Sequence, residues 1–257
     1  MCELLGMSAA RDTDVTELLQ KFYSHSDRHP NGWGLAIRRN GSMEITKEPV
    51  RASRSEYLGT LLASGVRTDV LLAHIRYATV GGEAYENSHP FTAKDNSGRT
   101  WTLIHNGTIF GYSHLGPYQY TQCGRTDSER ILLYLVHMIN SGQRMGGKPM
   151  DVLEQLGLLQ AILRDMAQGN KLNLILYDGE LMYVHTNYAN SLYTLRRDGA
   201  VFFATVPLTE EPWEPVPFTT LCAYKNGRCY FQGDAHGAEY IDRPEDTHYL
   251  YTEFAAL

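Results

Sequence analysis

The sequence predicts an α+β protein in which antiparallel sheets are covered by helices. Asn-Gly or Asp-Gly pairs separate runs of β-branched and aromatic residues at four places, Asn40-Gly41, Asp178-Gly179, Asp198-Gly199 and Asn226-Gly227. Each pair predicts an antiparallel hairpin. Stretches with the apolar spacing of amphipathic helices lie between these groups of hairpins. Sheets and helices of this kind pack in layers around a shared core.

The first predicted helix carries apolar residues at the spacing i, i+3, i+4, i+7, namely Val15, Leu18, Leu19 and Phe22. Asp12 or Thr13 is its expected cap. A second helix is predicted over about residues 53–63. A further turn at residues 95–98, Asp-Asn-Ser-Gly, then joins two strand-like runs at residues 89–93 and 99–104.

The third predicted helix opens with a capping-box pattern at residues 126–129, Thr-Asp-Ser-Glu, and ends near Gly142. The fourth is predicted over residues 151–168. Both helices are too apolar for an exposed position, so we expect them to cover a sheet.

The 257 residues contain no internal repeat and no Gly/Ser linker, so we expect one domain spanning residues 1–257. Lys and Arg number 23 against 29 Asp and Glu, a formal charge of 23 − 29 = −6, which argues against a nucleic-acid partner. No apolar run approaches the roughly 18 residues of a membrane span. The first residues lack the basic and apolar regions of a secretory signal. A cytoplasmic protein without nucleic-acid or membrane partners is the expectation.

The four cysteines show neither zinc spacing nor a CxxC motif. Cys222 and Cys229 flank a predicted hairpin, but they would lie diagonally, so a disulfide is not expected. The histidines of the first half lack metal-ligand spacing. A phosphate-binding glycine loop is absent as well. We therefore predict no metal and no cofactor.

Cys2 stands apart because removal of Met1 would place a free α-amine beside its thiol. An α-amine titrates near neutral pH and can accept the thiol proton, so one residue would supply both nucleophile and base. The alternative is that a cysteine falls at position 2 by chance.

Two further motifs follow apolar strands. The run at residues 71–82 ends in Arg76 and Thr79, a guanidinium and a hydroxyl that suit a carboxylate. The alternative is a surface arginine that closes a strand. Asn106 and Gly107 form either a simple turn or an oxyanion hole made of an amide side chain and a backbone N–H. His74 is expected to be a core histidine.

Asp127 falls in the first turn of the third predicted helix or at its cap. A carboxylate there either caps the helix or binds a substrate ammonium.

Together, Cys2, the Arg-Tyr-Ala-Thr run from Arg76, Asn106-Gly107 and the Thr-Asp-Ser-Glu run at 126–129 resemble the class II glutamine amidotransferases, which are N-terminal nucleophile hydrolases. The order and approximate spacing of the motifs match over roughly residues 2–136. Residues 31–34, Asn-Gly-Trp-Gly, resemble a segment that lies close to the nucleophile in stand-alone members of the family. Tyr77 and Val80 depart from the Trp and His of the hexosamine-forming branch, which argues against that branch.

The resemblance implies a four-layer αββα sandwich of two antiparallel sheets. It further implies that Cys2 is the nucleophile and its α-amine the base, with Asn106 and Gly107 as the oxyanion hole. The residues that would bind glutamine are then Arg76, Thr79 and Asp127, with His89 near the glutamine loop.

The implied reaction is cleavage of the amide of glutamine, or of a γ-glutamyl amide, through a thioester on Cys2. No synthase domain follows within the 257 residues, so ammonia is expected to pass to a separate synthase partner. One alternative is an amidohydrolase for a γ-glutamyl peptide or thiol metabolite. Another is a non-catalytic binding module on the same fold, which a retained Met1 would favour.

Overall fold

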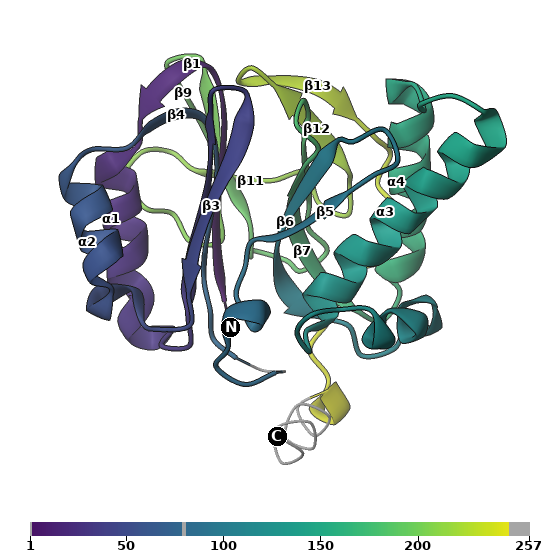
Figure 1. Cartoon of the computed structure of the whole chain (residues 1–257), viewed down its shortest axis with the longest axis horizontal. Helices are drawn as coiled ribbons and strands as arrows, with labels where there is room; N and C mark the ends of the chain where they lie inside the picture. Colours follow the sequence, from purple (N-terminus) through teal and green to yellow (C-terminus); the bar gives the residue numbers. More distant parts are fainter. Residues whose placement is uncertain (1, 79–80, 247–257) are drawn as a thin grey trace.

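The computed structural model describes residues 2–78 and 81–246. Its elements form four layers in the order helices, sheet, sheet, helices (Figure 1). The first sheet has the spatial order β11 (Glu214–Pro215), β9 (Tyr193–Arg197), β10 (Ala200–Ala204), β1 (Glu3–Asp14), β4 (Arg67–Ile75), β2 (Trp33–Arg39) and β3 (Ser42–Glu48). The second has the order β13 (Arg228–Gln232), β12 (Cys222–Lys225), β8 (Met182–His185), β7 (Lys171–Tyr177), β6 (Thr100–Thr108) and β5 (Phe91–Lys94).

Helices cover the outer face of each sheet. The first sheet is covered by α1 (Thr16–Ser24) and α2 (Glu56–Ala63), and the second by α3 (Asp127–Gly146) and α4 (Val152–Met166) (Figure 1). Short 3₁₀ helices lie in the connections, η1 (His25–Arg28), η2 (Ala52–Arg54), η3 (Tyr85–Asn87) and η4 (Ser113–Tyr120). The predicted αββα sandwich of antiparallel sheets is confirmed.

Three apolar clusters lie between the four layers, because successive side chains of a strand point to opposite faces. On β1, Leu5 packs toward the helices α1 and α2 while Leu4 packs between the sheets. On β6, Leu103 packs toward α3 and α4 while Ile104 packs between the sheets. This alternation fixes which side chains at the strand ends enter the space between the sheets.

All four predicted Asn-Gly and Asp-Gly hairpins are present, joining β2 to β3, β7 to β8, β9 to β10 and β12 to β13. In the last hairpin Cys229 pairs with Tyr224. The pairing then shifts by one residue, so Cys222 lies opposite Gln232 and not opposite Phe231. The four cysteines are all unpaired as thiols.

The predicted ends of two helices were wrong. Helix α1 begins at Thr16, since β1 continues through Asp12 and Thr13 to Asp14, whose carboxylate accepts the N–H of Thr16 at 3.0 Å. Helix α3 runs past Gly142 to Gly146 and ends at a left-handed Gly147. At residue 142 the helix passes close to the side chain of Met150, where a Cβ would lie 2.7 Å from the sulfur.

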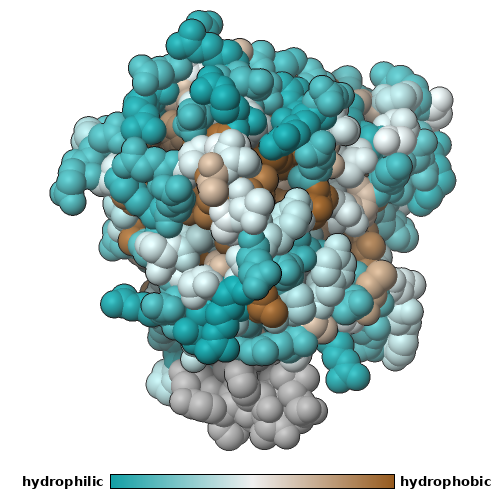
Figure 2. All heavy atoms as spheres, turned by 60° about the vertical axis from the view of Figure 1, so that its left-hand side comes forward, coloured by the Kyte–Doolittle hydropathy of each residue, from teal (hydrophilic) through white to brown (hydrophobic). Residues whose placement is uncertain are grey.

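No helix of the described segments is long and apolar enough to cross a membrane. The face seen in Figure 2 is mostly hydrophilic, with apolar side chains exposed in small separate areas.

Four histidines are buried inside the sandwich, and burial lowers the pKa of each below its ordinary value, for His185 to about 3. They are His74, His89, His105 and His185. The rings of His74 and His89 stack at a centroid distance of 3.9 Å, and their nitrogens have no hydrogen-bond partner in the described segments. The predicted core position of His74 is confirmed.

These histidines predict that acid destabilises the fold. Below a pH of about 6.5 the unfolded chain takes up protons that the folded protein excludes. The free energy of unfolding should then fall by about 1.4 kcal/mol per pH unit for each histidine as the pH decreases. Urea titrations between pH 7.5 and 5.0 measure the slope, and at the acidic end of this range His185→Gln should reduce it by about one proton. An unchanged slope in that variant would contradict the explanation.

Candidate active site

Cys2 lies directly before β1 and is brought to the end of β4 by strand pairing. Glu3 pairs with Ile75, so the residues just outside the pair are Cys2 and Arg76. The N–H of Tyr77 donates to the sulfur of Cys2 at 3.3 Å, and the thiol lies 3.4 Å from the carbonyl of Tyr77. Because Cys2 is two residues from Leu4, its side chain points toward the space between the sheets.

The protein around Cys2 favours the neutral thiol. Removal from water raises the pKa of Cys2, and this exceeds the opposing effects of the Tyr77 N–H and the Arg76 guanidinium. A thiol with a raised pKa needs a base nearby before it can act as a nucleophile.

Arg76 is buried, with 3% of its surface exposed, so the interpretation as a surface arginine was wrong. Its guanidinium donates to the carbonyl of Gly81 at 2.7 Å and to that of Gly82 at 3.0 Å. Burial lowers its pKa, while the nearby Cys2, Glu83 and Asp127 act in the opposite direction. The charge of Arg76 is therefore held close to the thiol. Thr79 lies outside the described residues.

Asn106 and Gly107 lie inside β6 and not in a turn, so the turn interpretation was wrong. Asn106 is two residues from Ile104, so its side chain faces the sheet that carries Cys2. It is mostly buried, at 6% exposure, and its amide makes no hydrogen bond to any residue that the structure describes. The amide is free to donate to a substrate.

Sheet geometry also orients the N–H of Gly107. Gly107 pairs with Leu172 on β7, and Leu172 directs its own N–H away from β6, to the side chain of Asn187 at 2.8 Å. The pair is thus a non-hydrogen-bonded one, so the N–H of Gly107 also points away from β7. A Cβ at residue 107 would collide with the carbonyl of Lys171.

Asp127 is the first residue of α3, and the N-cap is Thr126, whose hydroxyl accepts the N–H of Glu129 at 3.2 Å. One carboxylate oxygen of Asp127 accepts the N–H of Ile109 at 2.9 Å, and the other accepts the N–H of Ser128 at 2.8 Å. Asp127 also lines a cavity of about 360 Å³ between α3 and the segment after β6. It therefore remains in contact with open space.

His105 supports Asp127 through Ser128. The Ser128 hydroxyl donates to the Asp127 carboxylate at 3.3 Å and lies 2.9 Å from Nδ1 of His105. The Ser128 hydroxyl therefore links the imidazole of His105 to the Asp127 carboxylate. The predicted capping box is only half formed, since the Glu129 carboxylate binds the N–H groups of Cys123 and Gly124 instead.

His89 is buried, and its ring packs between His74 and Phe91. Cys2, Arg76, Asn106, Gly107 and Asp127 gather at one end of the sandwich, while the ring of His89 is enclosed among other side chains there.

The sequence did not single out Asn31, although it belongs to the predicted segment 31–34. Its side chain accepts the N–H of Ala78 at 2.9 Å and donates to Glu83 at 2.6 Å. It thus holds the chain immediately after Tyr77. Only its position beside two glycines in the sequence could have indicated this role.

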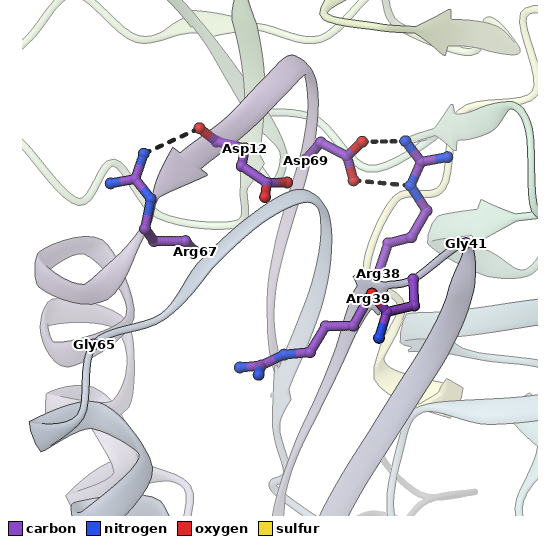
Figure 3. Close-up of a pocket in the computed structure, with 8 residues that line it drawn as sticks. Asp12, Arg38, Arg39, Gly41, Gly65, Arg67 and Asp69 are labelled. Carbon is purple, nitrogen blue, oxygen red and sulfur yellow. Dashed lines mark hydrogen bonds and ion pairs between the residues drawn. The ribbon is translucent and has the colours of Figure 1, made fainter.

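A second cavity, of about 670 Å³, lies at the opposite ends of the same strands (Figure 3). Arg38, Arg39 and Arg67 line it, but each guanidinium has an acidic partner, namely Asp69, Glu44 and Asp14. β1 separates this cavity from Cys2, so it takes no part in the site. Across the described segments no group of three or more His, Cys, Asp or Glu side chains is arranged to hold a metal ion.

The comparison with protein families agrees with this arrangement. The model of the class II glutamine amidotransferases matches residues 1–200. The chain belongs to this family. The resemblance predicted from the sequence motifs is confirmed, and so is the N-terminal nucleophile type of fold.

Two relatives match most of the chain. The protein MJ1515 of Methanocaldococcus jannaschii, which is named as uncharacterized, is 29% identical over 90% of this chain and 71% of its own length. YafJ of Escherichia coli K12, whose name places it provisionally among the glutamine amidotransferases, is 31% identical over 80% of each chain. A glutamine–fructose-6-phosphate aminotransferase of Xylella fastidiosa is 27% identical over 64% of this chain, but only 25% of that enzyme is matched.

Solved structures show the same fold. A crystal structure from Pseudomonas aeruginosa PA01, of a protein predicted to be a glutamine amidotransferase, has a TM-score of 0.63 at 21% identity and covers 90% of this chain and 100% of its own. The glutamine phosphoribosylpyrophosphate amidotransferase of B. subtilis has a TM-score of 0.66 at 16% identity. It covers 92% of this chain, which matches 49% of its length.

Proposed function

We propose that this chain, acting as one domain, hydrolyses the side-chain amide of glutamine or of a γ-glutamyl amide, with Cys2 as nucleophile. The observation that carries the proposal is the place of the Cys2 thiol, between the backbone of Tyr77 and the charge of Arg76, at the edge of the space that Asn106 faces. Family membership supports glutamine as the substrate type.

In the proposed first step, Met1 has been removed and the α-amine of Cys2 accepts the thiol proton. The thiolate attacks the amide carbon, and negative charge develops on the amide oxygen. The free amide of Asn106 and the outward N–H of Gly107 donate to that oxygen. Ammonia or an amine then leaves with the proton, and a γ-glutamyl thioester remains on Cys2.

In the second step, water attacks the thioester and releases glutamate. We propose that Arg76 and Thr79 bind the α-carboxylate of the substrate and that Asp127 binds its α-ammonium. His89, whose ring stacks on that of His74, is proposed to support the loop around the bound glutamine. The released ammonia either passes to a separate synthase subunit or leaves the protein. A γ-glutamyl peptide or thiol metabolite would use the same groups.

A substrate panel tests the proposal on protein whose intact mass shows that Met1 is absent. We expect glutamate to be released from glutamine or a γ-glutamyl amide, and little hydrolysis of asparagine, whose amide lies one methylene nearer the charged end. A glutamine analogue without the α-carboxylate should react much more slowly, because it leaves Arg76 unused. If the mature protein binds glutamine in calorimetry but hydrolyses none of these amides, the non-catalytic binding module is correct instead.

A further inference from the structure

Asn87 connects two loops that approach the candidate site from different parts of the chain. It ends η3 and is buried, with 4% exposure. Its side-chain Nδ2 donates to the carbonyl of Gly82 at 3.0 Å, and its Oδ1 accepts the N–H of Arg125 at 2.8 Å. One amide therefore binds a loop on each side.

The first of these loops holds Arg76. The Gly82 carbonyl that accepts from Asn87 also accepts from the Arg76 guanidinium, at 3.0 Å, and the neighbouring Gly81 carbonyl accepts from the same guanidinium at 2.7 Å. Asn87 thus holds one of these two carbonyls, which accept from the guanidinium.

The second loop leads into Asp127. Arg125 stands two residues before it, and the same loop is held from the helix side by Glu129, whose carboxylate accepts the N–H of Gly124 at 2.8 Å. Asn87 and Glu129 thus hold the backbone of residues 124–125, which lead into α3 and its first residue, Asp127.

Each loop contacts Asn87 through a glycine, and neither glycine has room for a side chain. A Cβ on Gly124 would lie 2.5 Å from Oδ1 of Asn87, and a Cβ on Gly81 would lie 2.9 Å from its Nδ2. Gly81 also has a φ of +76°, a conformation that favours glycine. The two loops are therefore shaped around this one amide.

We propose that Asn87 is a positioning residue that sets the separation of Arg76 and Asp127, and through it the selection of substrates that carry both an α-carboxylate and an α-ammonium. The inference rests on the proposed function, in which those two charges bind the two ends of glutamine. Displacement of a binding group by about 1 Å can lower a rate by about 100-fold.

The test compares two reagents for Cys2 on the full chain without Met1. One is a glutamine-like chloroketone that carries both α groups, and the other is iodoacetamide, which carries neither. Peptide mapping measures the alkylation rate of Cys2 by each. In Asn87→Ala the chloroketone rate is expected to fall at least about tenfold while the iodoacetamide rate stays unchanged. Ser88→Ala is the matched control, since Ser88 is buried in the same loop and the hydroxyl that the substitution removes donates locally, to the carbonyl of Ala84 at 3.1 Å.

Two results would overturn the positioning role: an unchanged ratio of the two rates in Asn87→Ala, which includes an equal fall of both rates, or an equal effect of Ser88→Ala on that ratio. A wild-type protein that shows no preference for the chloroketone would instead contradict the proposed function. If Asn87→Ala does not fold, Asn87→Asp keeps the volume and the acceptor for Arg125. Because its carboxylate cannot donate to Gly82, the chloroketone preference should still fall.

Discussion

Replacing Cys2 by alanine in the mature protein is expected to abolish glutamate release, with a loss on the order of 10⁴-fold or more in kcat. The reason is that the thioester cannot form without the sulfur, and the remaining groups only bind the substrate. Initial rates with the substrate found in the panel measure the loss. A glutamine-like chloroketone should label the wild-type protein once, on Cys2.

The matched controls are the other cysteines. Cys123 is exposed, and Cys2 is partly exposed. Cys123 lies outside the strands whose pairing brings the site residues together, and its backbone N–H donates to Glu129. Cys123→Ser and Cys229→Ser should keep full activity. An adduct found chiefly on one of these residues, or a Cys2→Ala variant that still turns over, would remove Cys2 from the mechanism.

The hairpins were predictable because each is encoded within a few residues. Asn40, Asp198 and Asn226 adopt φ values of 50°, 53° and 51°, which Asn and Asp tolerate best among residues with a side chain. The one-residue shift beside Ala223 was not predictable, since neither β12 nor β13 contains a glycine or proline that would mark a bulge.

Helix ends were less predictable, because a glycine can end a helix or fit inside one. Gly142 matched the signal for an end, yet the helix continues, and the missing side chain makes room for Met150. The glycine that does end α3 is Gly147, in the left-handed conformation. The choice between the two depends on tertiary packing that a local pattern does not contain.

For the candidate site, the resemblance to the family implied that Cys2, Arg76 and Asp127 serve one site, and the structure places the three residues near one another. The groups that hold them were not predicted. Asn87 and Arg125 are 38 residues apart, and His105 and Ser128 are 23 apart. Neither pair has a local signature, so only the fold shows that they are in contact.

The last expectation concerns Asn106→Ala, which should lower kcat by about 100- to 1000-fold while leaving the melting temperature close to that of the wild type. Its amide makes no hydrogen bond to any residue that the structure describes, so its removal breaks no contact there and takes away one donor to the developing oxyanion. Initial rates and thermal melts of the same preparation separate the two effects.

Asn173 supplies a matched control, because it lies directly opposite Asn106 on β7 and both polar atoms of its side-chain amide are hydrogen-bonded. It donates to Ser191 at 2.9 Å and accepts from Thr186 at 2.7 Å. Asn173→Ala should therefore lower stability by about 1–3 kcal/mol and keep the rate per folded molecule. The opposite pattern, with Asn106→Ala unstable but fully active, would show that Asn106 serves the sheet and not the oxyanion.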